Sequence, residues 1–122
     1  MRFPILFTGA GRAMVVLGIT RSGSHVEVGD SEVHVRLSWS FRATFPRSSV
    51  RAVGHDSDKV WGWGAHGWRG RWLVNGSSSN VVRIDIAPAT RARVLGVPVR
   101  LDVLRVSVAD PDALIAALTP DA

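Results

Sequence analysis

The chain of 122 residues contains no cysteine, no tyrosine and a single lysine, Lys59. The absence of cysteine excludes thiolate zinc sites, thiol redox motifs and cysteine nucleophiles. It also leaves no disulfide that would indicate an oxidising compartment. A chain of this length forms one domain of residues 1–122, with its core at about 12–118, and needs neither disulfide nor metal to fold.

Long apolar runs are missing as well. The run at residues 13–19 is too short to span a bilayer and fits a buried strand. Arg12 and the nearby glycines interrupt the apolar segment that a signal peptide would need. We therefore expect a cytoplasmic protein with no transmembrane segment.

Positive charge is in excess, and arginine carries nearly all of it. Fifteen Lys and Arg against ten Asp and Glu leave a formal net charge of +5. Arginine provides a planar fork for phosphate or carboxylate, but codon bias in a high-GC genome would enrich it equally well. The charges are spread along the chain, with no run of five or six of one sign. They can steer the protein to an anionic surface without marking a site.

Alternating apolar and polar residues predict a β-hairpin at residues 25–37. With Asp30-Ser31 as the loop, apolar pairs fall on one face and polar pairs on the other, as a one-sided sheet requires. The predicted cross-strand pairs are Val28–Val33, Glu27–His34, Val26–Val35 and His25–Arg36.

Further strands are predicted at residues 13–19, 39–45 and 50–53, and a second hairpin is predicted to pair 71–75 with 81–86. In that hairpin, residues 82, 84 and 86 share one face, and Arg83 and Asp85 take the other. The alternation at residues 99–108 changes phase between Val103 and Leu104. This slip predicts a β-bulge or a break between two short strands.

The chain ends in a predicted helix at residues 110–118. Asp110 can cap it, Pro111 fits the first helical position, and Asp112 complements the positive end of the helix dipole. Pro120 stops the helix. The apolar stripe that would dock it on a sheet is Leu114, Ile115 and Leu118.

This order of about seven short strands and one helix resembles the bacterial pleckstrin-homology-like (PH-like) domains, which include small proteins of high-GC bacteria. The resemblance rests on residues 18–20, 26–28, 33–37, 46–50 and 105–114. It implies a mainly β fold, a bent barrel of about seven antiparallel strands in two near-orthogonal sheets, capped by one C-terminal α-helix. It also implies a role in binding or assembly.

Residues that could support catalysis or metal binding form no established pattern. His55-Asp56-Ser57-Asp58 places three candidate ligands together, but the spacing matches no zinc or EF-hand motif, and a solvated turn is the better interpretation. The chain has no Gly-x-Ser-x-Gly elbow. Gly62-Trp63-Gly64 lacks the helix that a dinucleotide fingerprint requires. We expect no enzymatic activity, no cofactor and no metal site.

The tryptophan-rich segment, residues 61–72, is the strongest candidate for function. It holds four of the five tryptophans together with four glycines and two arginines. It is either an unusual part of the core or a binding edge, and both interpretations stay open. As a binding platform it would use Trp61, Trp63, His66, Trp68, Arg69, Arg71 and Trp72.

Such a platform best fits a protein partner or self-association, because Trp and Arg often anchor interfaces. The alternative is a small ligand or an anionic lipid surface, bound through the same segment. Five tryptophans without tyrosine, and only modest charge, fit nucleic acid less well. We therefore predict a non-enzymatic protein-interaction or scaffolding module.

Overall fold

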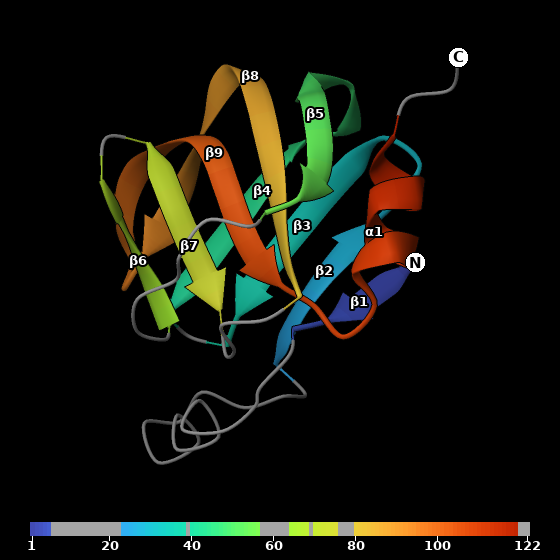
Figure 1. Ribbon diagram of the computed structural model, residues 1–122. Helices are drawn as coiled ribbons and strands as arrows, with labels where there is room; N and C mark the ends of the chain where they lie inside the picture. Colours follow the sequence, from blue (N-terminus) through green and yellow to red (C-terminus); the bar gives the residue numbers. More distant parts are fainter. Residues whose placement is uncertain (6–22, 39, 57–63, 69, 76–79, 120–122) are drawn as a thin grey trace.

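The computed structural model of the chain describes residues 1–5, 23–38, 40–56, 64–68, 70–75 and 80–119; for residues 64–68 and 75 it describes only the backbone. In these parts of the chain, nine strands curl into a half-barrel, and one helix packs beside it (Figure 1). The predicted mainly β class and the C-terminal helix are confirmed. The predicted strand at residues 13–19 and Trp39 lie outside the described residues.

The elements are β1 (Arg2–Pro4), β2 (Ser24–Val28), β3 (Glu32–Leu37), β4 (Phe41–Pro46), the 3-10 turn η2 (Arg47–Ser49), β5 (Val50–His55), β6 (Gly64–Trp68), β7 (Arg71–Asn75), β8 (Val81–Val94), β9 (Val97–Ser107) and α1 (Pro111–Leu118). Across the sheet the order is β1-β2-β3-β4-β8-β9-β7-β6, and β5 pairs with β8 off this path. The long β8 bends, so that one end pairs with β5 and the other with β4. This bend turns β8 and β9 from the front of the barrel to its back (Figure 1).

The first predicted hairpin is confirmed in its register. β2 and β3 pair antiparallel through the four predicted pairs, among them Val26 with Val35 and Glu27 with His34. The valines of this hairpin are buried, because alternate side chains of a strand point to the same face. They form one wall of the core.

The second predicted hairpin is wrong. β7 and β8 are not neighbours, because β9 lies between them, antiparallel to β8 and parallel to β7. The sheet is therefore not wholly antiparallel. The predicted faces of β8 are nevertheless correct: Val82, Ile84 and Ile86 are buried, whereas Arg83 and Asp85 are partly exposed. Alternation specifies which face a strand buries, but not which strand lies beside it.

The phase slip in β9 is a bulge. The backbone N–H groups of Asp102 and Val103 both donate to the carbonyl of Gly70, at 2.8 and 3.1 Å. Two residues of β9 thus oppose one residue, Gly70. As a result, the inward-facing positions of β9 shift from odd-numbered residues such as Leu101 to even-numbered residues such as Leu104. A bulge bends and twists a strand, which helps the sheet to curl.

The helix begins and packs as the sequence predicts. The Asp110 carboxylate accepts a hydrogen bond from the Ala113 N–H at 3.2 Å, and Pro111 occupies the first helical position. Leu114 and Leu118 are buried in the same core as the strands. Arg47, in η2, donates to the carbonyl of Ala117 at 2.5 Å and so holds the end of the helix.

Candidate anion-binding face

The tryptophan-rich segment is described only in part. Trp61, Trp63 and Arg69 lie outside the described residues. His66 and Trp68 belong to β6, and their backbone pairs in register with Leu73 and Arg71 of β7. Residues 64–68 and 71–75 therefore form two antiparallel strands.

Trp72 and Arg71 lie in different environments. Trp72 is half-buried and packs against the core, with its ring centroid 6.4 Å from that of Phe41 and the rings tilted by 45°. The indole Nε1 is buried and, within the described residues, has no hydrogen-bond partner. Arg71, one position earlier, is exposed. Packing accounts for this tryptophan, and Arg71 remains available to a partner.

A different set of residues gathers positive charge. Five exposed arginines occupy the outer face of β3, β4, β8 and β9, which we call the arginine face. Cross-strand register places Arg36 opposite Arg42, Arg42 opposite Arg93, and Arg91 opposite Arg100. Residues that no short-range pattern connects thus form two adjoining rows.

Strand alternation places these side chains outside. Each arginine follows or precedes a residue that is buried or packed against the core, and neighbouring side chains of a strand point to opposite faces. The inward-facing neighbours are Leu37, Phe41, Ala43, Ala92, Val94, Val99 and Leu101.

The arginine face carries little negative charge of its own. Arg100 forms an ion pair with Asp102, Nη2 to Oδ2, at 3.3 Å. Arg36 and Arg93 donate to the carbonyls of Ser38 and Gly96, each at 3.2 Å. Within the described part of the chain, Arg42 and Arg91 have neither an ion pair nor a hydrogen bond. Like charges directly opposite each other destabilise a sheet, so the free protein carries this repulsion.

In the described chain, the neighbouring strand β2 adds no free carboxylate to this row. His25 lies opposite Arg36, and Glu27 is held by Arg2 at 3.2 Å. The Arg2 hydrogen bond lowers the pKa of Glu27. The pKa of His25 is lowered by burial first and by the charge of Arg2 next; Glu27 opposes this, and Arg36 adds to it. The positive potential of these arginines therefore reaches β2.

Between Arg91 and Arg100 the surface is hollowed. An open depression of about 510 Å³ lies over the β8–β9 pair and is lined by Ala89, Thr90, Arg91, Pro98, Val99 and Arg100. Its two guanidinium groups come from opposite strands. A phosphate or carboxylate in this depression can accept hydrogen bonds from both sides.

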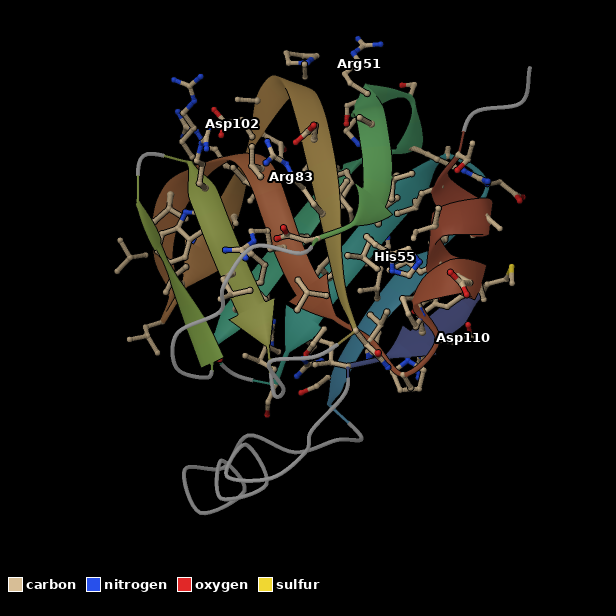
Figure 2. The ribbon with its side chains drawn as sticks, viewed as in Figure 1. Arg51, His55, Arg83, Asp102 and Asp110 are labelled. Carbon is tan, nitrogen blue, oxygen red and sulfur yellow. The ribbon has the colours of Figure 1, made fainter. Side chains whose placement is uncertain are left out.

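The His55–Asp58 cluster is not a solvated turn at its first two residues. His55 ends β5 beside α1 (Figure 2). Its Nε2 lies 2.7 Å from Asp112 Oδ1 at the start of α1. The Asp56 side chain is 5% exposed and forms an ion pair with Arg105 of β9. Ser57 and Asp58 lie outside the described residues. Both described members thus have structural partners, which tie β5 to the helix and to β9.

Sequence reasoning missed the arginine face. The only local signal is that each arginine alternates with apolar residues; the pairing of β4 with β8 joins residues about fifty positions apart. No family model matches the chain, and no curated protein or solved structure is significantly similar to it. In the described part of the chain, no helix has the length and apolarity needed to cross a bilayer.

Proposed function

We propose that this protein is a non-enzymatic, PH-like binding module whose arginine face docks on a surface rich in phosphate or carboxylate groups. The observation that carries the proposal is the direct opposition of Arg42 to both Arg36 and Arg93, with no acidic side chain bound to any of the three in the described chain. The curled sheet and the C-terminal helix support the PH-like assignment. The parallel β7–β9 pair departs from it.

Binding of an anion would offset the repulsion between the arginines of this face. Guanidinium groups present paired N–H donors that match the oxygens of phosphate and carboxylate, and they stay charged at every physiological pH. A row of arginines on adjacent strands, whose backbones lie about 5 Å apart, suits a partner with repeated anionic groups. The repulsion in the free protein then becomes attraction in the complex.

The test is to measure the binding of inorganic polyphosphate by calorimetry at low and high salt. We expect an affinity that falls as salt rises, because each neutralised phosphate releases counterions. Arg42→Gln should weaken binding and flatten the salt dependence. Arg51→Gln is the matched control, since it removes the same charge from an exposed position near the start of β5, at the top of Figure 2.

Equal losses in the two variants would mean that only net charge matters and would overturn the arginine face as the site. A loss confined to Arg71→Gln would instead place anion binding in the tryptophan-rich segment, as the alternative of a small ligand or an anionic lipid surface predicts. Retained binding by Arg51→Gln with loss in Arg42→Gln is the result that supports the proposal.

A further inference from the structure

The turn between β8 and β9 presents two large apolar side chains to solvent. Leu95 is 62% exposed and Val97 is 60% exposed. Within the described residues, Met1 is the only other large hydrophobic side chain that is exposed. Among the described residues, none covers these two side chains, which stand together on one tip.

The backbone of this tip makes the leucine more unusual. Leu95 has φ +52° and Gly96 has φ +81°, and Val94 pairs with Val97 around them. Tight hairpin turns of this kind favour Asn, Asp or Gly, because other side chains collide with their own backbone at positive φ. Neither the local backbone conformation nor exposure to water favours leucine at position 95. A contact with another molecule would favour it.

The apolar tip and the arginine face are adjacent. Arg93 stands two residues before Leu95 on β8, with Arg42 directly opposite it. The Leu95 N–H donates to the carbonyl of Ser40, just before β4, at 2.9 Å, so the tip sits at the end of the sheet where this row lies. At about 3.3 Å per residue, the Cα atom of Arg93 lies roughly 7 Å along the strand from that of Leu95, and its guanidinium reaches forward to the Gly96 carbonyl at 3.2 Å.

This spacing matches the layering of a bilayer surface. Interfacial proteins bury apolar side chains about 5–10 Å into the boundary between headgroups and acyl chains, and basic residues behind them meet the phosphates of anionic lipids. A nucleic acid offers phosphates to the arginines but no hydrocarbon to Leu95 and Val97. The tip therefore distinguishes between two partners that the charge alone cannot separate.

We propose that the anionic surface is an anionic phospholipid bilayer, into which the β8–β9 tip inserts Leu95 and Val97 while Arg36, Arg42 and Arg93 contact lipid phosphates. This inference rests on the proposed function and adds the partner and the orientation. It makes the tip the hydrophobic anchor and the arginine face the electrostatic one.

The experiment is flotation with phosphatidylcholine vesicles, with and without phosphatidylserine. The variant Leu95→Asn with Val97→Thr removes the anchor while it keeps the shape of residue 97 and suits the turn, so the fold should be retained or stabilised. We expect its affinity for phosphatidylserine vesicles to fall by about tenfold or more, as the loss of buried apolar area requires. Its affinity for polyphosphate should equal that of the wild type.

Insertion is measured directly with one label. Because the chain has no cysteine, Leu95→Cys can carry an environment-sensitive fluorophore at a single position. Its emission should shift to the blue with phosphatidylserine vesicles, whereas the same label on the exposed Ala116→Cys of α1 should not shift.

The outcomes separate the two proposals. If the wild type binds polyphosphate but the tip variant floats equally well, or the Leu95 label does not shift, insertion is wrong and the proposed function stands. Tighter binding to RNA than to phosphatidylserine vesicles, with no effect of the tip variant, would identify nucleic acid as the partner and overturn this inference. If the wild type binds neither polyphosphate nor vesicles, the proposed function fails as well.

Discussion

Arg42 of β4 lies directly opposite Arg93 of β8 on the outer face of the sheet. Arg36 lies opposite Arg42 on the other side, so one arginine stands between two others across three adjacent strands. Stability alone would place a carboxylate at this position. The arrangement therefore favours anion binding at the expense of folding stability. A substitution that removes the charge of Arg42 should weaken binding and raise the free energy of unfolding.

Arg42→Glu should stabilise the protein and abolish anion binding. The new carboxylate would face Arg36 and Arg93 and convert two repulsive pairs into attractive ones, worth a few tenths to about 1 kcal/mol each. Urea denaturation at low and high salt measures the gain, which should shrink as salt screens the charges. A destabilised variant, or a gain that salt does not change, would contradict the repulsion.

Gly70→Ala should destabilise the protein more than alanine at other glycines. Gly70 has φ +85°, and an added Cβ would lie 2.8 Å from Asp102 Oδ1. The strained backbone alone costs about 1 kcal/mol or more. Gly96→Ala, at φ +81° with open space around it, isolates that cost, and Gly54→Ala tests open space without positive φ. Chemical denaturation should rank the losses as Gly70, Gly96, Gly54.

If Gly70→Ala and Gly96→Ala lose the same free energy of unfolding, the Asp102 side chain moves aside without cost. Asp102→Ala combined with Gly70→Ala should recover the part of the loss that comes from the collision. Such a recovery would assign that part to the contact at the β9 bulge.

Leu118→Ala should cost about 2–5 kcal/mol of stability, because it leaves a cavity between the helix and the sheet. Leu118 is 2% exposed and Leu114 is fully buried. Ala116→Gln, on the exposed side of the same helix, is the control and should change stability little. A melting curve that Leu118→Ala leaves unchanged would show that the helix does not pack on this core.

The stability of the protein should depend on pH through His25. Its folded-state pKa is lowered, mainly by burial and then by Arg2. Between that lowered pKa and the ordinary value of 6.5, the unfolded chain binds more protons than the folded one, so the free energy of unfolding rises with pH. Thermal melting of His25→Gln across about pH 5 to 8 should show a flatter rise.

Arg36→Gln tests the electrostatic part of this effect. The charge of Arg36 contributes to the lowering, so its removal should move the titration of His25, followed by NMR, to higher pH. A titration that stays in place would mean that Arg36 does not act on His25 across the strand pair.

Local signals predicted the elements whose causes are local. The β2–β3 register follows from alternation around Asp30-Ser31, and the helix start follows from Asp110 and Pro111; both are confirmed. The bulge at Asp102 and Val103 was visible in the sequence as a change in the phase of the alternation. The strand residues before and after the bulge must bury their apolar side chains in the same core, so the alternation changes phase there.

Pairings that depend on distant residues were not predictable in this way. Residues 71–75 and 81–86 both read as strands with a Gly-Ser loop between them, and a hairpin was the nearest arrangement. In the structure β9 is inserted between them. The apolar pattern of β7 and of β8 fits pairing with each other or with β9 equally well. Only the burial of the whole core favours β9 as the neighbour of both strands.

The sequence by itself determined the mainly β class, the inward face of each confirmed strand, the cap of the helix and an excess of arginine. Only the tertiary structure decided that five of those arginines share one face, that Arg42 stands between Arg36 and Arg93, and that an apolar turn adjoins them. The physical reason is range. Side-chain alternation and capping act over a few residues, whereas the neighbours of a strand are chosen by contacts that the folded chain makes across its full length.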